Sequence, residues 1–183
     1  MNVFIAGPRA ISVLDKAVVE RLNNIFANKH TVLVGDADGV DSSVQRFFSY
    51  LQYRNVVVFA CEGKARNNIG SWEVRNIAVP PRLRGFKYYE VKDKAMSTDA
   101  DYGFMIWNGE SKGTLNNIIN LVKQGKKTVV YHTKTQSFFN ISSDSGLQDL
   151  ISICGQKTQL LFSRLITPIV PNDLQQISLF NAR

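Results

Sequence analysis

The sequence predicts an α/β fold with an open, mostly parallel sheet and helices on both faces. Short apolar runs typical of buried strands alternate with segments whose apolar residues recur at helical spacing, as in the run 2–6 followed by the pattern at 15–28. Such alternation favours parallel strands joined by right-handed crossovers. A run as continuous as NVVVFA at 55–60 needs cover on both faces of the sheet. The expected architecture is therefore Rossmann-like.

The elements are expected mainly within the first 133 residues. Strands are expected at 2–6, 31–34, 55–60, 86–91, 102–107 and 128–132. Helices are expected at 15–28, 42–53, 92–99 and 114–124. Residues 62–70 are expected to form a long loop, and residues 71–79 one or two helical turns stopped by Pro80-Pro81.

The character of the chain changes near residue 133. We interpret residues 1–133 as one domain built on the sheet and residues 134–183 as a C-terminal extension. In the extension, residues 134–146 are polar with two phenylalanines, a helix is expected at 147–154, and a mixed tail contains Pro168 and Pro171. The extension could be a cap, an edge strand or an oligomerisation arm, and its sequence does not decide among them.

The composition is that of a globular protein: 44% hydrophobic and 20% charged residues. No run of 18 apolar residues occurs, so no membrane span is expected. The N-terminus, MNVFIAGPRA, enters a strand pattern without the basic region and long apolar stretch of a signal peptide. We therefore expect a cytoplasmic protein.

The net charge of +7 favours anionic partners such as phosphates, nucleotides or nucleic acid. Nucleic-acid binding is the less favoured of these, because no helix-turn-helix, zinc-finger or stacked-aromatic pattern accompanies the charge. Cys61, Cys154, His30 and His132 are not at metal-ligand spacing. We expect neither a metal site nor a bound cofactor.

Loops at the carboxyl ends of the strands carry the candidate site, because ligands of open α/β sheets bind there. These loops are Gly7-Pro8-Arg9, 35–41, 61–70 and 108–114. Three of them have glycine where a strand gives way to a helix, which lets backbone amides approach an anion. One such glycine is weak evidence because it is often only a turn, whereas three together favour an anion site.

The loop Asn108-Gly109-Glu110-Ser111-Lys112-Gly113-Thr114 is the strongest of these signals. It follows an apolar strand and opens a helix, as a phosphate-binding loop does. It is not a Walker A loop, because the G-x-x-x-x-G-K-[ST] order is absent. Thr114 is also a candidate N-cap of the helix, a role compatible with phosphate binding.

Three separated segments resemble the SLOG superfamily. They are GDADGVDSSV at 35–44, SWEVRN at 71–76 and DADYGFMIWNGESKGTLNNIINLVKQGKKTVVY at 99–131. This group of Rossmann-like proteins includes the DprA/Smf proteins, the LOG phosphoribohydrolases and small stand-alone nucleotide-binding members. The resemblance spans about 130 residues and does not reach residues 134–183.

The resemblance implies a site for a nucleotide or a nucleotide-derived ligand, and a homo-oligomer. By its motifs, Gly7 and Arg9 would lie near the base or phosphate, and Arg75 with Asn76 would reach in from the side. The second loop would contribute Gly35, Asp36, Asp38, Gly39 and Asp41, and the loop before the fourth predicted helix would bind phosphate through Gly109, Lys112, Gly113 and Thr114.

One departure from the family pattern concerns catalysis. LOG enzymes resemble the nucleoside deoxyribosyltransferases in placing a glutamate on the helix just after the Gly-Thr pair, whereas this chain has Asn116 and Asn117 there. An amide can hold a ribose hydroxyl or a phosphate, but it cannot act as the nucleophile or stabilise an oxocarbenium-like centre by its charge. A LOG-type reaction would need another carboxylate. The candidates are Asp36, Asp38, Glu73, Asp101 and Glu110.

Several of these residues also have ordinary structural interpretations. Asp38 and Asp41 are typical loop and N-cap residues for the helix at 42, and Glu73 is typical of a helix surface. Trp107, with Trp72, could stack on a base, but it ends an apolar strand and is as well suited to core packing.

Three functions from different classes are consistent with the sequence. The first is binding of a nucleotide or nucleotide-derived small molecule, for sensing or sequestration, without transforming it. The second is an N-glycosidase or phosphoribohydrolase acting on nucleoside monophosphates, with Glu73 or Asp38 as the catalytic carboxylate. The third is DprA-like nucleic-acid binding, prompted by the basic charge.

Overall fold

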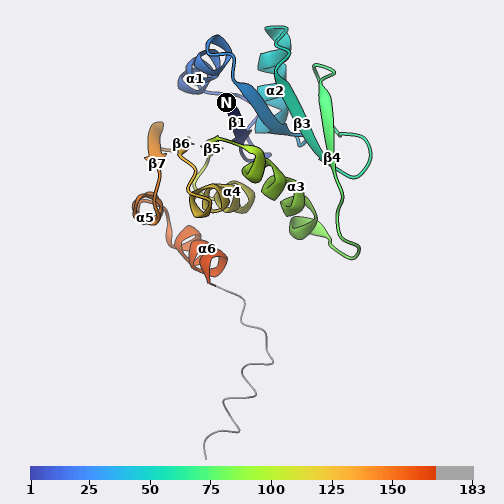
Figure 1. Cartoon of the computed structure of the whole chain (residues 1–183). Coiled ribbons are helices and arrows are strands. Elements are labelled where there is room, and N and C mark those ends of the chain that lie inside the picture. Colours follow the sequence, from blue (N-terminus) through green and yellow to red (C-terminus); the bar gives the residue numbers. More distant parts are fainter. Residues whose placement is uncertain (168–183) are drawn as a thin grey trace, which may run out of the picture.

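The protein has the predicted α/β fold in a computed structural model that describes residues 1–167 (Figure 1). Its sheet has the order β4-β3-β2-β1-β5-β6-β7. Neighbouring strands are parallel except for β7, which is antiparallel to β6. The strands are β1 (Asn2–Ala6), β2 (Thr31–Gly35), β3 (Val56–Cys61), β4 (Glu73–Ile77), β5 (Tyr102–Trp107), β6 (Thr128–His132) and β7 (Ser137–Ile141).

Helices cover both faces of the sheet, as the apolar strands require. On one face α1 and α2 bury Leu22 and Phe48 against Val3 and Val34. On the other face α3 to α6 pack, with Leu115 of α4 in their shared core. The helices are α1 (Lys16–Ala27), α2 (Val40–Tyr50), α3 (Gly85–Asp99), α4 (Lys112–Lys123), α5 (Asp144–Ser152) and α6 (Gln156–Ile166).

The segment 71–99 differs from the sequence prediction in two elements. Residues expected to form helical turns include β4, an edge strand parallel to β3. The predicted strand at 86–91 and helix at 92–99 form one helix, α3. Both predictions are wrong because the apolar pattern is weak there: β4 has no fully buried residue, and the buried residues of α3 include Glu90, Lys92 and Ser97. Tertiary pairing and buried polar contacts determine these elements.

The C-terminal extension packs onto the sheet domain. β7 pairs with β6, while α5 and α6 contact α4. Thr158 of α6 is buried, and its Oγ1 donates a 2.6 Å hydrogen bond to the carbonyl of Gly109, in the loop that precedes α4. The rest of the predicted extension, 168–183 with Pro168 and Pro171, lies outside the described residues. Among residues 1–167, no helix has the length and apolar character needed to cross a membrane.

Candidate functional site

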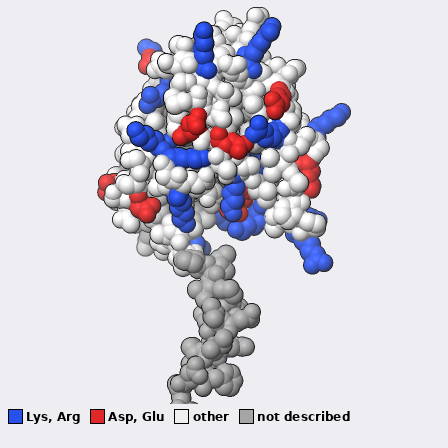
Figure 2. Space-filling view, viewed as in Figure 1, with Lys and Arg blue, Asp and Glu red and all other residues white. Residues whose placement is uncertain are grey.

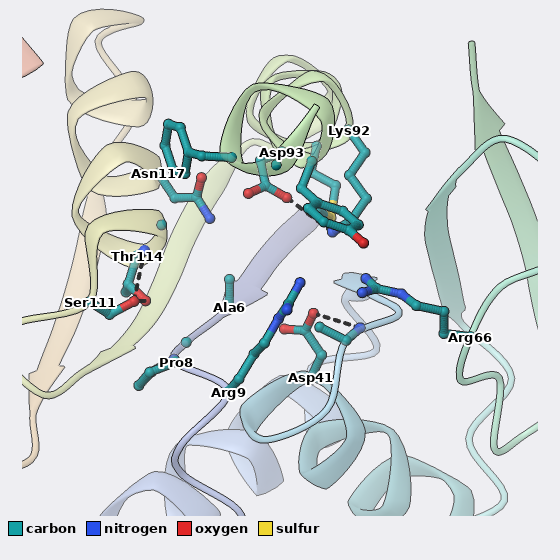
Figure 3. Close-up of a pocket in the computed structure, with 17 residues that line it drawn as sticks. Ala6, Pro8, Arg9, Asp41, Arg66, Lys92, Asp93, Ser111, Thr114 and Asn117 are labelled. Carbon is teal, nitrogen blue, oxygen red and sulfur yellow. Dashed lines mark hydrogen bonds and ion pairs between the residues drawn. The ribbon is translucent and has the colours of Figure 1, made fainter. Parts of the chain in front are cut away.

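A cavity of about 510 Å³ opens near the carboxyl ends of β1 and β5, where the strand order reverses (Figure 3). Its size is within the usual range of small-molecule sites, and its place in the sheet is where such folds bind ligands. The lining residues are Ala6, Gly7, Pro8, Arg9, Ala37, Asp41, Arg66, Gly85, Phe86, Tyr89, Lys92, Asp93, Met96, Ser111, Gly113, Thr114 and Asn117.

At Gly39, the loop after β2 packs closely against the turn after β1. Its φ is +77°, and a Cβ there would collide with the backbone of Arg9. The Val40 amide donates to the Pro8 carbonyl over 3.3 Å. Gly39 is also the N-cap of α2, so the predicted N-cap role of Asp38 or Asp41 is wrong, because the helix begins at Val40 rather than at residue 42. This close approach brings Arg9 and Asp41 to one cavity.

Arg66, which lines the cavity, forms a bidentate ion pair with Asp36 behind it. Arg66 donates from Nη2 to Oδ1 over 2.6 Å and from Nε to Oδ2 over 2.9 Å, and its backbone amide also donates to Oδ2 over 3.1 Å. Burial would raise the pKa of Asp36, but these hydrogen bonds outweigh it and hold the pKa below its ordinary value of 3.8. The pair fixes the 62–70 loop against the end of β2.

Lys92 is the buried cation of the site, with 4% of its surface exposed. Its Nζ lies 3.0 Å from Asp93 Oδ1 and 3.9 Å from Asp36 Oδ1. A Cβ at Gly35 would lie 2.8 Å from this Nζ, so the glycine makes room for the ammonium. Burial alone would lower the pKa of Lys92, but Asp93, Asp41 and Asp36 outweigh it and the pKa is raised. Lys92 therefore stays charged within an acidic cluster.

Asp41 lies in the first turn of α2 and faces the same cluster. Its Oδ2 accepts a 3.2 Å hydrogen bond from the Ala37 amide. Burial raises the pKa of Asp41 from 3.8 to about 6, although the charge of Lys92 opposes the shift. A carboxylate of this kind exchanges its proton near neutral pH.

The first turn of α4 forms the opposite wall. Ser111 is the N-cap, and its Oγ accepts from the Thr114 amide (3.4 Å) and from Thr114 Oγ1 (3.0 Å). The predicted N-cap role of Thr114 is wrong, because α4 begins two residues earlier, at Lys112. A Cβ built on Gly113 meets no atom within 4 Å, so this residue leaves open space beside the N-terminal turn.

Asn117 lies one turn further along α4 and has 4% of its surface exposed. Its Oδ1 is buried without a hydrogen-bond partner among residues 1–167. In Figure 3 the Asn117 amide and the Asp93 carboxylate, from α4 and α3, point toward the same space. A buried amide oxygen without a partner costs free energy, so the Asn117 amide is an unsatisfied polar group beside the cavity.

Two aromatic rings of α3 complete the lining. The Tyr89 ring lies near two guanidinium groups, with its centroid 5.1 Å from Arg9 Cζ and 4.7 Å from Arg66 Cζ. The ring centroid of Phe86 lies 4.2 Å from Lys112 Nζ. The sequence interpretation missed Tyr89, Phe86, Lys92 and Asp93, although a spacing of 86, 89, 92, 93 and 96 was a helical signal with a polar component.

The structure brings together six of the residues predicted for ligand binding. Those that line the cavity are Gly7, Arg9, Asp41, Gly113, Thr114 and Asn117. Behind the lining, Gly35, Asp36 and Gly39 position these residues and their partners through the close approaches and ion pairs described above.

The other predicted residues lie outside the cavity lining. Glu73, Arg75 and Asn76 are exposed on β4, where Arg75 forms an ion pair with Asp99. Asp38 accepts a 3.1 Å hydrogen bond from Asn67, and Asp101 accepts a 2.6 Å hydrogen bond from the Asn2 amide. Trp107 is fully buried in the core, where its indole donates to the Ser111 carbonyl over 3.1 Å. Gly109 packs against His132, Lys112 is exposed, and Glu110 forms an ion pair with Lys134.

Charge is mixed on the face of the molecule shown in Figure 2. Lys and Arg side chains are interspersed there with Asp and Glu rather than gathered into one basic area. Within residues 1–167, no group of three or more His, Cys, Asp or Glu side chains is arranged to hold a metal ion. The candidate site in residues 1–167 is therefore the cavity, where charged side chains and the Asn117 amide lie close together.

Comparison with protein-family models gives no match for this chain, and neither does comparison with curated proteins. The arguments for function therefore depend on the geometry of the cavity and on the motifs in the sequence.

Proposed function

We propose that this protein binds a nucleotide or a nucleotide-derived small molecule in the cavity between α3 and α4. The observation that carries the proposal is the convergence of three features on one cavity: the open N-terminal turn of α4, the side chain of Arg9 and the unpaired amide of Asn117. Each is a common feature by itself, but together they match a ligand that has an anionic end and a polar middle.

The phosphate of the ligand is assigned to the Ser111–Thr114 turn and Arg9. Backbone amides at a helix N-terminus point toward an anion, and the helix dipole favours negative charge there. Gly113 keeps that position open. Arg9 is exposed and forms no ion pair among residues 1–167, so its charge is free to meet a phosphate.

The base is assigned to the α3 side of the cavity mouth. Phe86 and Tyr89 are half-buried and line the cavity, so they offer apolar ring surface to a planar ligand. The resemblance to the SLOG superfamily independently suggests a nucleotide-derived ligand. Binding without transformation, for sensing or sequestration, agrees with asparagines at 116 and 117, where LOG enzymes carry a glutamate. Homo-oligomerisation remains a prediction from that resemblance.

Calorimetry with nucleoside monophosphates, ADP-ribose and cyclic dinucleotides tests the proposal. We expect at least one to bind the wild type and to lose measurable binding in Gly113→Val, whose side chain would fill the space beside the α4 turn. Gly155→Val is the matched control, because a Cβ at Gly155 also meets nothing within 4 Å and lies outside the cavity. Failure of every phosphorylated ligand to bind the wild type would overturn the proposed function.

A second candidate function is hydrolysis of an N-glycosidic bond in a nucleoside monophosphate. The carboxylates predicted for it, Glu73 and Asp38, do not line the cavity, whereas Asp41 and Asp93 do. The reaction would bond the water oxygen to C1′ and break the C1′–N bond. Asp93 would take the proton of the water and pass it to the leaving base, so that free base and ribose 5-phosphate are released. Chromatographic detection of free base, absent in Asp93→Asn, is the expected sign. A wild-type protein that binds monophosphates without releasing base excludes this activity.

A further inference from the structure

We infer that the cavity selects ligands with adjacent ribose hydroxyls, so that ribonucleotides bind in preference to 2′-deoxyribonucleotides. The inference rests on the proposed nucleotide binding and specifies which part of the ligand the inner wall recognises. It depends on an excess of unpaired hydrogen-bond acceptors at that wall.

Three acceptor atoms there have no donor among residues 1–167. Asn117 Oδ1 is buried and unpaired. Asp41 accepts only at Oδ2, from the Ala37 amide, and Asp93 only at Oδ1, from Lys92. Asp41 Oδ1 and Asp93 Oδ2 therefore remain available to a ligand. A carboxylate accepts hydrogen bonds but never donates when ionised.

The charges nearby disfavour a phosphate at this wall. Lys92 is committed to Asp93 and Asp36, and Arg66 is committed to Asp36. A phosphate here would face the carboxylates of Asp41 and Asp93, whereas Arg9, which lines the cavity and forms no ion pair among residues 1–167, is assigned above to a phosphate at the α4 turn. A hydroxyl group, in contrast, donates to these oxygens without adding charge. The phosphate is thus directed to the α4 turn, and the hydroxyls to the inner wall.

The arrangement fits a pair of hydroxyls better than a single one. The acceptors come from three helices, with Asp41 on α2, Asp93 on α3 and Asn117 on α4. Figure 3 shows them around a common space. A ribose presents neighbouring 2′ and 3′ hydroxyls, which can donate to two of these acceptors, whereas a 2′-deoxyribose can donate to only one of them. A divalent cation is disfavoured because the Lys92 ammonium already occupies the centre of the acidic cluster.

The discriminating experiment compares each ribonucleoside 5′-monophosphate with its 2′-deoxy counterpart by calorimetry, in the full chain, with and without Mg²⁺. We expect the deoxy ligand to bind at least about tenfold more weakly, because a desolvated acceptor loses its partner. The ratio should fall below about threefold in Asn117→Leu and in Asp93→Asn. Asp149→Asn, an exposed carboxylate on α5, is the matched control and should keep the wild-type ratio.

The outcomes separate this inference from the proposed function. Equal binding of ribo and deoxy ligands to the wild type overturns the inference and leaves nucleotide binding intact. Equal binding that requires Mg²⁺ also overturns it, in favour of a metal held by the carboxylates. If no nucleotide binds, both the proposed function and the inference fail. Circular dichroism of each variant establishes folding, and the wild-type ratio alone decides the inference should either variant fail to fold.

Discussion

The α3 and α4 walls of the cavity contain similar numbers of polar groups but use them differently. On the α3 side, Lys92 and Asp93 belong to a set of ion pairs that continues through Asp36 to Arg66. On the α4 side, Asn117 Oδ1 has no partner within residues 1–167 and Gly113 leaves open space. The polar groups of the α3 wall are thus paired by folding, and we propose that those of the α4 wall are paired by a ligand. Substitutions should therefore separate stability from binding.

The largest expected effect is loss of stability when Lys92 is replaced by methionine. Lys92→Met keeps an unbranched side chain of similar length but leaves Asp93, Asp41 and Asp36 without their shared cation. Removing one partner of a buried ionic set typically lowers the free energy of unfolding by about 3–5 kcal/mol. Urea denaturation followed by circular dichroism measures the change.

Lys94→Met is the matched control for this prediction. Lys94 is on the same helix, 58% of its side chain is exposed, and it lies 3.7 Å from Glu90. Its replacement should change the free energy of unfolding by less than about 1 kcal/mol. Equal effects of the two substitutions would contradict the view that the α3 wall is completed by folding.

The next largest effect is a pH dependence of the free energy of unfolding that Asp41 alone should cause. Its pKa is raised from 3.8 to about 6, so the folded state binds this proton more tightly than the unfolded state. The free energy of unfolding should therefore fall as pH rises from about 4 to about 6, and Asp41 should cause no further fall above that. A shift of about 2 pKa units corresponds to about 3 kcal/mol.

Asp41→Asn should remove this fall, because asparagine does not ionise. The two proteins are compared by urea denaturation at pH 4 and pH 7, and the variant is expected to gain stability relative to the wild type at the higher pH. Asp36 does not interfere: its pKa is lowered, so its stabilisation is present above 3.8 and is lost only as pH falls below that value. Parallel pH profiles for the two proteins would refute the assignment.

The two walls also differ in how far they could be predicted from sequence. Asn117 and Gly113 follow a clear apolar strand within one local motif, so their position at the sheet edge could be inferred. The ion pair of Arg66 with Asp36 joins residues 30 positions apart, and Lys92 reaches both Asp36 and Asp93. Local patterns do not encode such pairings.

The same limit explains the errors in the fold. Strands β1, β2, β3, β5 and β6 were predictable because their apolar runs are continuous. The α3 sequence FKYYEV is rich in aromatic and β-branched residues, which favour strands, yet it forms a helix that buries Glu90 and Lys92. A helix that buries charged groups lacks the apolar stripe on which the prediction depends.

A smaller effect is expected where the C-terminal extension meets the α4 wall. Thr158→Val removes the hydroxyl that donates to the Gly109 carbonyl and leaves that buried acceptor unpaired. The free energy of unfolding should fall by about 1–2 kcal/mol in urea denaturation. Thr167→Val, which removes an exposed hydroxyl bonded to Ser163, should cost less than about 0.5 kcal/mol. A Thr158→Val protein as stable as the control would show that α6 does not support the loop before α4.

The smallest effect on stability, and the sharpest test of the contrast between the walls, is expected for Asn117→Leu. Leucine has the same branching at Cγ and the same number of side-chain heavy atoms, and it removes a buried oxygen that lacks a partner, so the free energy of unfolding should stay unchanged or rise by about 1 kcal/mol in urea denaturation. Asn120→Leu is the matched control, because Asn120 also has an unpaired buried amide atom on α4 but does not line the cavity. Both variants should fold as well as the wild type, and only Asn117→Leu should weaken ribonucleotide binding. A large loss of stability in Asn117→Leu would mean that folding, rather than a ligand, uses the Asn117 amide.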